Sequence, residues 1–377
     1  MYIKGVGMTN FDVSEMPSHL LAYEAAYNAI EDSGISINDI DAVFLANLDF
    51  HSNVFKQRHI TSMLSSLFKR NIPIIRTVTA CSTGGSALWT ANKIAKNDKD
   101  IENIIVLGVE KFSASPHPII TDELLMGADN KFEQPEGMIF PAQNALIAQE
   151  HFLRYGSNLD DLALIALKNH ENAFLNPKAK FYNKGVSLDE IKKSRIVVSP
   201  LRLFDCSISV DGAAACILSK DKSNVKIIGS GLYTDHLASC DREDTLTWEA
   251  TRLAASEAYK QAGITPKDVD LVELHDAFTI VELISYEDLG FAEKGKGQEL
   301  IRDGVVNLDG RLPVNPSGGL KAKGHPISAT GIAQIVELTE QLRGESKERQ
   351  VSNARIGLAQ NVGGAGGTVT VHILRKV

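Results

Sequence analysis

The sequence predicts an α/β protein made of two duplicated halves, with a further segment inserted into the first half. The first observation is an internal repeat, in which residues 25–47 (AAYNAIEDSGISINDIDAVFLAN) and 254–276 (AASEAYKQAGITPKDVDLVELHD) follow one pattern. The second is that strand patterns and helix patterns alternate in both halves. The third is a proline-containing stretch in the first half that interrupts this alternation.

Each copy of the repeat predicts a helix, a polar turn and a buried strand. The alanine-rich helices end at Gly34 and Gly263, because glycine adopts the left-handed backbone of a helix end at low cost. A short strand containing Gly-x-Gly precedes each copy, at residues 3–7 and 227–231. Two copies so far apart indicate a duplication and not a solenoid.

The repeat divides the chain into residues 1–221 and residues 222–377. The inserted segment covers about residues 115–198, where we expect helices near 143–155 and 158–174. Loops of this kind often carry substrate contacts. The prolines that mark the insertion are Pro116, Pro118, Pro135, Pro141 and Pro177. Further strands are expected at residues 74–79, 104–108, 225–229, 271–274 and 368–374.

The composition of the chain favours a cytoplasmic enzyme. Its 377 residues are 44% hydrophobic and 23% charged, with a net charge of -8, which argues against a nucleic-acid-binding protein. The N-terminus lacks the pattern of a secretory signal, and no apolar stretch approaches the roughly 20 residues that span a membrane. The four cysteines show no metal-ligand spacing, so we expect free thiols and no metal site.

Cys81 is the strongest candidate nucleophile. It lies in the segment TACSTGGSA, where a strand pattern gives way to a helix pattern. The partial positive charge at a helix start lowers the cost of a thiolate, so we expect a lowered pKa for Cys81. The alternative is a buried cysteine that acts only as a small hydrophobic residue.

Three further segments carry candidate chemistry. His325 lies on a Gly-rich loop before a helix, where it can act as a base or a hydrogen-bond donor, or only stabilise the loop. His275 and Asp276 lie at the end of a strand, where the first repeat has the apolar Ala46, and they are either functional or a capped strand end. The glycines of residues 360–367 indicate either a tight turn or a close approach of the backbone to a ligand.

In this order, the motifs resemble those of the thiolase family over essentially the whole chain. Thiolases have an active cysteine in a small-residue turn, an Asn-Glu-Ala-Phe motif, a Gly-His-Pro motif and a C-terminal Gly-rich turn. Here residues 275–278 are His-Asp-Ala-Phe, which together with residues 200–207 (PLRLFDCS) and 211–215 (DGAAA) resembles sterol-carrier-protein-type and archaeal acetoacetyl-CoA thiolases. The resemblance implies βαβαβ-type halves in a layered α/β/α/β/α thiolase fold with an inserted loop domain.

The resemblance also implies a role for each residue. Cys81 matches the acyl-accepting nucleophile, and His325 matches the histidine that activates it and contributes to an oxyanion hole. His275 occupies the position of the asparagine that polarises a thioester oxygen. Gly363 matches the glycine whose N–H, with that of Cys81, forms the second oxyanion hole. Substrate contacts are expected at Asn361, Lys321 and Lys323.

One position departs from the family pattern. The usual second cysteine, an acid/base, is Asn361 here, and Ala277 stands where sterol-carrier-type thiolases have a possible replacement. An amide has no usable titration near neutral pH. The α-proton must therefore pass to His275, His325 or a water molecule, and among these we expect His275.

The implied reaction is the condensation of two acetyl-CoA molecules to acetoacetyl-CoA and CoA, or its reverse, without a tightly bound cofactor. The resemblance implies a homodimer or tetramer and a place in the mevalonate route to isoprenoids. Archaeal relatives assemble with HMG-CoA synthase and a small zinc-ribbon, OB-fold protein. The alternatives are a condensing enzyme like ketoacyl synthase or HMG-CoA synthase, and a thiolase-like subunit that only holds partners.

Overall fold

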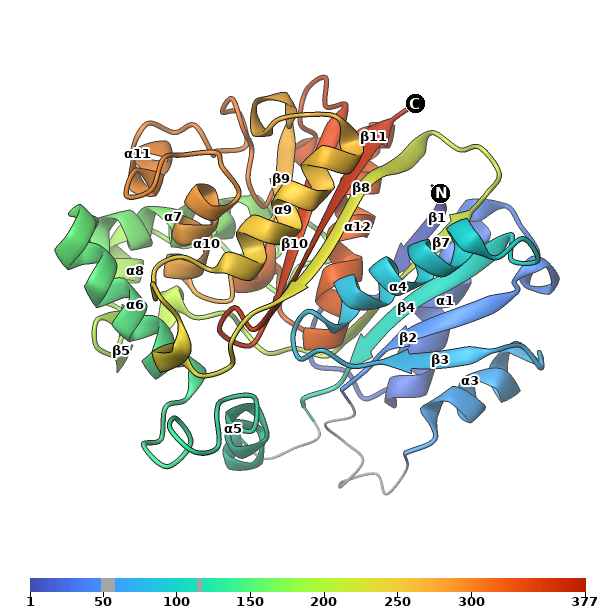
Figure 1. The fold of residues 1–377 in the computed structure, drawn as a ribbon, viewed down its shortest axis with the longest axis horizontal. Coiled ribbons are helices and arrows are strands. Elements are labelled where there is room, and N and C mark those ends of the chain that lie inside the picture. The colour runs from blue at the N-terminus through green and yellow to red at the C-terminus, as the bar shows by residue number, and fades with distance from the viewer. Residues whose placement is uncertain (49–57, 114–116) are drawn as a thin grey trace.

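A computed structural model describes residues 1–48, 58–113 and 117–377 (Figure 1). Within them, one mixed sheet has nine strands in the order β3-β2-β4-β7-β1-β8-β11-β10-β9. Its strands are β1 (Tyr2–Met8), β2 (Ala42–Ala46), β3 (Ile74–Thr77), β4 (Asn103–Glu110), β7 (Gly212–Ser219), β8 (Val225–Thr234), β9 (Leu271–Glu273), β10 (Ile356–Gly363) and β11 (Thr368–Lys376). A separate hairpin is formed by β5 (Ile196–Val198) and β6 (Leu201–Arg202).

The helices alternate with these strands. The α-helices are α1 (Ser18–Ser33), α3 (Ile60–Phe68), α4 (Thr83–Asn97), α5 (His117–Leu125), α6 (Phe140–Tyr155), α7 (Leu159–Phe174), α8 (Leu188–Lys193), α9 (Glu249–Ala262), α10 (Thr279–Asp288), α11 (Gly297–Arg302) and α12 (Ile327–Arg343). Short 3-10 helices are η1 (Ile37–Asp39), η2 (Leu203–Asp205), η3 (Ser239–Asp241), η4 (Pro266–Asp268) and η6 (Lys347–Arg349), and η5 (Gly319–Lys323) is a π-helix. The predicted strands and helices are confirmed, except that β3 ends at Thr77, two residues earlier than expected, and β9 ends at Glu273, one residue earlier.

The sheet consists of two halves that share one order of four strands, β2-β4-β7-β1 and β9-β10-β11-β8, and β3 is an additional edge strand of the first half. In the first half, β3, β2 and β4 are parallel, and β7 and β1 follow antiparallel. In the second half, β9 and β10 are parallel, and β11 and β8 follow antiparallel. Only two residues of β1 pair with β8, so the halves meet at a short junction. The duplication expected from the repeat is therefore present in the topology.

The helices form three layers around the two halves of the sheet. Helices α4 and α12 contact each other and the strands of both halves, so they form the central layer. Helix α1 covers β1, β4 and β7, and α9 covers β8 and β11 on the other outer side (Figure 1). The layered α/β/α/β/α arrangement is confirmed.

The repeated Gly-x-Gly and alanine patterns have one physical cause. A Cβ atom on Gly5 would lie 2.2 Å from the carbonyl oxygen of Ala29 in α1, and one on Gly229 would lie 2.2 Å from that of Ala258 in α9. Glycine in the strand and alanine in the helix thus allow each outer helix to lie against its sheet. The helices end at Gly34 and Gly263, both left-handed as expected, with φ of 68° and 65°.

The segment between β4 and β7 holds α5 to α8 and the β5–β6 hairpin. Helices α6 and α7 confirm the two helices expected there, and Pro116 lies outside the described residues. Although this segment is inserted in the first half, α7 contacts α10, α11 and η5 of the second half (Figure 1). Ile147 and Leu162 share an apolar core with Ile280. The division of the chain at residues 221 and 222 stays a prediction.

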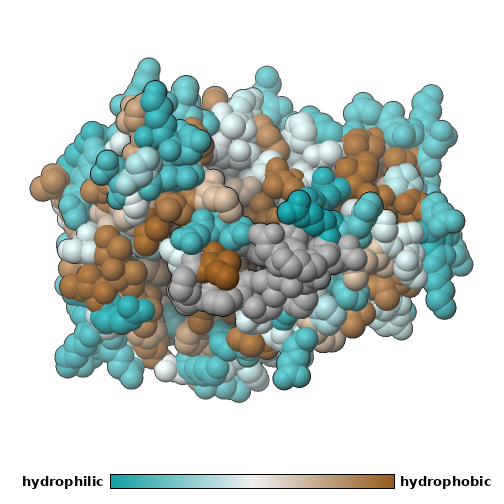
Figure 2. All heavy atoms as spheres, turned by 90° about the horizontal axis from the view of Figure 1, so that it is seen from below, coloured by the Kyte–Doolittle hydropathy of each residue, from teal (hydrophilic) through white to brown (hydrophobic). Residues whose placement is uncertain are grey.

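The surface of the molecule is mixed in polarity. On the face seen in Figure 2, apolar side chains form separate groups among polar ones. Among the helices in the described ranges, none combines the length and the apolar character that crossing a membrane requires.

Candidate active site

Cys81 lies between β3 and the first turn of α4, which begins at Thr83. The chain turns sharply there, because Ala80 adopts a left-handed backbone with φ of 49°. The following glycines pack tightly: a Cβ atom on Gly84 would lie 2.8 Å from the backbone oxygen of Ser328, and one on Gly85 would lie 2.0 Å from Oγ1 of Thr370. The small residues after Cys81 therefore let α4 pack against α12 and β11.

The second half brings two histidines to this cysteine. The sulfur of Cys81 and one ring nitrogen each from His275 and His325 all lie within 4.8 Å of one another. The two imidazole rings are 5.2 Å apart and nearly perpendicular, at 86°. His275 follows β9, and His325 lies between the π-helix η5 and α12. The three residues expected to be catalytic thus form one cluster, in which both histidines are buried and Cys81 is partly exposed.

His275 has a defined hydrogen-bond partner. Its Nδ1 lies 3.2 Å from Nδ2 of Asn361, and its backbone N–H donates to Oε1 of Gln360 at 3.3 Å. Oδ1 of Asn361 accepts a hydrogen bond from the backbone N–H of Gly85 at 3.1 Å. Asn361 therefore connects His275 to the first turn of the helix that follows Cys81.

His325 has a different kind of partner. Its Nδ1 lies 2.7 Å from Oγ1 of Thr330, and a hydroxyl either donates or accepts a hydrogen bond. Its backbone N–H donates to the carbonyl of Ile208 at 2.9 Å. The loop position of His325 is thus fixed by its backbone, while its ring is free to use either tautomer.

Burial keeps all three groups neutral. Burial raises the pKa of the Cys81 thiol to about 11, although the backbone N–H groups of Gly364 and of Cys81 itself act in the opposite direction. The expected lowering of this pKa was wrong, because loss of water outweighs the helix start. Burial also lowers the pKa of His325 to about 3, and burial followed by His325 lowers the pKa of His275 well below its usual value. At neutral pH the cluster is a thiol with two neutral imidazoles.

The Gly-rich turn closes the cluster on another side. Residues 364–367 connect β10 to β11, and the N–H of Gly367 donates to the carbonyl of Gly363 at 3.0 Å. A Cβ atom on Gly363 would lie 2.5 Å from the carbonyl oxygen of Thr79, so the segment is both a tight turn and a close backbone contact. In this turn, the backbone N–H of Gly364 acts to lower the pKa of the Cys81 thiol, although burial outweighs it. The oxyanion role expected for its neighbour Gly363 stays a prediction.

Sequence comparison identifies the family of this fold and site. Residues 2–222 match the profile of the thiolase N-terminal domain, and residues 231–376 match that of the thiolase C-terminal domain-like family. The chain belongs to the thiolase family. The expectation of an enzyme of the acyltransferase class is confirmed with it.

Several thiolase relatives are similar over nearly the full chain. The acetyl-CoA acetyltransferase of Methanothermobacter thermautotrophicus is 41% identical, with 99% of this chain and 98% of the relative covered. That of Methanocaldococcus jannaschii is 37% identical, with the same coverage of both chains. Human sterol carrier protein 2 is 33% identical over 100% of this chain and 72% of its own length. The resemblance to archaeal and sterol-carrier-type thiolases is therefore confirmed.

Solved structures agree on the thiolase fold. The structure titled Ltp2-ChsH2(DUF35) aldolase has a TM-score of 0.85 at 24% identity and covers 100% of this chain and 97% of its own. A monomeric SCP2-thiolase-like protein of Mycobacterium smegmatis has a TM-score of 0.74 at 19% identity, with 99% and 76% covered. At these identities the likeness concerns the fold.

The residues expected to contact substrate in this thiolase are buried. Asn361, Lys321 and Lys323 are at most 3% exposed. Nζ of Lys323 donates to Oγ of Ser317 at 2.8 Å and lies 3.6 Å from the carboxylate of Glu273. Nζ of Lys321 has no hydrogen-bond partner among the described residues, and burial lowers its pKa. Contact of these side chains with substrate stays a prediction.

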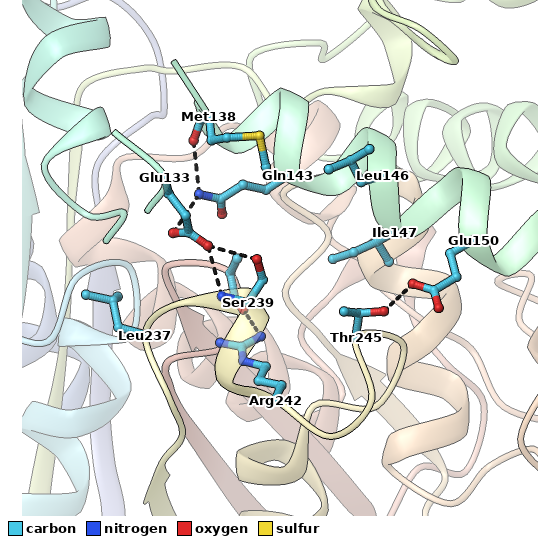
Figure 3. Close-up of a pocket in the computed structure, with 11 residues that line it drawn as sticks. Glu133, Met138, Gln143, Leu146, Ile147, Glu150, Leu237, Ser239, Arg242 and Thr245 are labelled. Carbon is cyan, nitrogen blue, oxygen red and sulfur yellow. Dashed lines mark hydrogen bonds between the residues drawn. The ribbon is translucent and has the colours of Figure 1, made fainter. Parts of the chain in front are cut away.

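The residues that contact and position the catalytic cluster and the Gly-rich turn were not predicted from the sequence. The hydroxyl of Thr330 lies at the ring of His325. The sequence could have indicated Thr330, because it lies about one helical turn after the Gly-His-Pro motif. Arg242 donates from Nη1 to the carbonyl of Ala365 in the Gly-rich turn at 2.6 Å. Both Arg242 and Ala365 line a cavity of about 200 Å³ between α6 and the loop before α9 (Figure 3). No motif in the sequence indicates Arg242.

The same cluster has the ligand types of a metal site. One thiol sulfur and two imidazole nitrogens are the donors that zinc prefers. The hydrogen bond from Asn361 to His275 opposes such use, because a metal-binding histidine normally donates its other ring nitrogen to an acceptor.

Proposed function

We propose that the chain is an acetyl-CoA acetyltransferase, which joins two acetyl-CoA molecules into acetoacetyl-CoA and CoA through an acetyl group on Cys81, or catalyses the reverse reaction. The observation that carries this proposal is the cluster of Cys81, His275 and His325, whose ligand atoms lie within 4.8 Å of one another. The archaeal relatives named acetyl-CoA acetyltransferase, 41% and 37% identical, support the choice of substrate.

In the first half-reaction, His325 takes the proton of the Cys81 thiol as the sulfur attacks the thioester carbonyl. A neutral imidazole is the form that accepts a proton, and burial keeps His325 neutral. The backbone N–H groups around Gly363 and Cys81 would stabilise the oxyanion. The carbonyl re-forms, the C–S bond to CoA breaks, and CoA leaves with the proton from His325.

In the second half-reaction, His325 is neutral again and takes the α-proton of a second acetyl-CoA. The enolate carbon attacks the acetyl group on Cys81, a carbon–carbon bond forms, and the Cys81 sulfur leaves and regains the proton from His325. His275 donates a hydrogen bond to the enolate oxygen. One base thus serves both steps, which replaces the second cysteine that this chain lacks.

This assignment differs from the expectation that His275 takes the α-proton. Nδ1 of His275 already faces the amide Nδ2 of Asn361, whereas Nδ1 of His325 faces a hydroxyl that accepts or donates. His325 is therefore the ring that changes its protonation without losing a partner. Loss of a single oxyanion donor such as His275 should lower the rate on the order of 100-fold.

The test is the intact mass of the protein after incubation with acetyl-CoA. We expect the gain of one acetyl group in the native chain and in Cys206→Ala, and no gain in Cys81→Ala. Cys206 is a suitable control because it is also a free, partly buried cysteine. Acetylation that persists in Cys81→Ala, or turnover of acetoacetyl-CoA by that variant, would contradict the proposal.

We propose that the protein is cytoplasmic and that it is an oligomer. We infer a homodimer or tetramer, with HMG-CoA synthase and a small zinc-ribbon, OB-fold protein as partners in the mevalonate pathway. A complex with a second protein is supported by the relative in fold Ltp2-ChsH2(DUF35) aldolase, whose name joins two proteins. Molar mass by light scattering, alone and with each candidate partner, tests this: a strictly monomeric chain that binds neither would contradict it.

A further inference from the structure

We propose that Asn361 is a positioning residue that holds His275 in the tautomer with its hydrogen on Nε2, and that this tautomer disfavours a zinc ion in the cluster of Cys81, His275 and His325. The inference deepens the proposed function, in which His275 is a hydrogen-bond donor. It rests on two hydrogen bonds of the Asn361 side chain and on the tight space around its amide.

The first step is the orientation of the Asn361 amide. Gly85 is the third residue of α4, so its backbone N–H has no acceptor within the helix. Oδ1 of Asn361 accepts that N–H at 3.1 Å. A turned amide would place two donors against each other there. The amide is also enclosed, because Asn361 is 1% exposed and a Cβ atom on Gly331 would lie 2.3 Å from Oδ1.

The second step is the tautomer of His275. With Oδ1 on Gly85, the group that faces Nδ1 of His275 at 3.2 Å is the NH₂ of Asn361, which only donates. Nδ1 must accept, so the hydrogen of the neutral imidazole is on Nε2. A charged imidazole would carry a hydrogen on Nδ1 that faces the NH₂ of Asn361, so this contact also requires a neutral ring. The free N–H of His275 is thus a fixed donor.

The third step concerns metal ions. Zinc bound at Nε2 of His275 would require the hydrogen to move to Nδ1, where it would face the NH₂ of Asn361. Loss of the hydrogen-bond partner of a metal-binding side chain usually lowers the metal affinity 10-fold to 100-fold. An aspartate at position 361 would reverse this effect, because one carboxylate oxygen accepts the N–H of Gly85 and the other accepts a hydrogen from Nδ1.

The experiment measures zinc affinity by competition with a chromophoric chelator, in the reduced chain without substrate. We expect Asn361→Asp to bind one zinc ion at least 10-fold more tightly than the native chain, and to lose that gain when Cys81→Ala is added. Asn353→Asp is the matched control, because it adds the same charge at an exposed position. Equal zinc affinity of the native chain and Asn361→Asp would overturn the inference.

A measurement on the native chain guards against a misfolded variant. In ¹⁵N-histidine-labelled protein, the signals of His275, assigned by their loss in His275→Gln, should show an unprotonated Nδ1 and a protonated Nε2. The opposite tautomer, or a charged ring, would overturn the inference. Neither readout needs catalysis. Absence of acetyl transfer with the expected zinc gain would therefore count against the proposed function and leave the inference intact.

Discussion

At the scale of single residues, Cys81 has a raised pKa although it stands at a helix start. Burial moves the pKa from 9.0 to about 11, which corresponds to roughly 3 kcal/mol against the thiolate, less for the part of the residue that stays exposed. A helix start contributes typically 0.3–1 kcal/mol, up to about 2 in partly buried sites. Burial therefore dominates, and the thiol needs a base at the moment of attack.

The reactivity of Cys81 tests this balance. We expect its alkylation rate by iodoacetamide to rise with pH over the range of roughly 7 to 10 without a plateau, because the thiolate fraction is still increasing there. The measurement is the rate of mass increase at Cys81 after digestion, with Cys240 in the same sample as an exposed reference. A plateau below about pH 8 would show a lowered pKa and contradict the argument.

At the scale of elements, the loop between β8 and α9 holds the Gly-rich turn. The guanidinium of Arg242 is 6% exposed and donates to the carbonyl oxygens of His236 and Ala365. Glu133, from the inserted segment, accepts hydrogen bonds from the backbone N–H and the hydroxyl of Ser239, both at 2.9 Å (Figure 3). The insertion, the loop and the turn beside Cys81 are therefore one connected unit.

Replacement of Arg242 should loosen this turn. In Arg242→Met we expect acetylation of Cys81 to slow on the order of 10–100-fold, because Arg242 holds the Gly-rich turn that packs against the segment before Cys81. Arg242→Lys should recover part of the rate. The rate is measured from the burst of CoA release.

Arg252→Met is the control for that comparison. Arg252 is exposed, and among the described residues its side chain pairs only with Glu249, so the same change of charge should leave the burst unchanged. An equal loss in both variants, or an unaltered burst in Arg242→Met, would show that Arg242 does not position the turn.

At the scale of the whole molecule, His372 joins the two halves. It lies on β11, 1% exposed, with Nε2 3.0 Å from the carbonyl oxygen of Gly85 in α4 and Nδ1 3.0 Å from Oγ of Ser230. Burial lowers its pKa to about 4. Because the folded-state pKa lies below the unfolded value of 6.5, the unfolded chain gains this proton first, and stability falls as the pH drops from about 6.5 to 4.

Other buried groups act in the opposite direction. Burial raises the pKa of Asp276 to about 7 and that of Asp288 to about 6, so the folded chain takes up these protons first and gains stability on acidification. The total pH dependence is a sum of opposing contributions, and a variant is needed to isolate His372.

His372→Gln should be less stable than the native chain at pH 7, because it loses hydrogen bonds. The difference in unfolding free energy should shrink by about 3 kcal/mol as the pH falls towards 4, since the variant has no imidazole to protonate. Urea unfolding at several pH values measures it. His236→Gln makes the same replacement at an exposed position and is the control. A constant difference for His372→Gln would contradict the assignment.

The sequence by itself determined the elements and the nucleophile's neighbourhood. The Gly-x-Gly strands, alanine-rich helices and capping glycines of the repeat depend on contacts within one copy, so they were predictable from neighbouring residues. The motifs around Cys81, His275 and His325 also led to the family. These features depend on residues close in sequence or recur in each half, so the hydrophobic periodicity and the internal repeat indicate them.

Only the tertiary structure decided how the site behaves. The pKa of Cys81, the partner of His275 and the support from Arg242 depend on residues that are distant in sequence, such as Gly364, Asn361 and Ala365. The burial of these groups and the direction of their hydrogen bonds are set when the two halves pack together through the central helices α4 and α12. No local sequence pattern encodes which donor faces which ring nitrogen. The sequence therefore led us to expect His275 as the base, whereas its contacts in the structure favour a role as a hydrogen-bond donor.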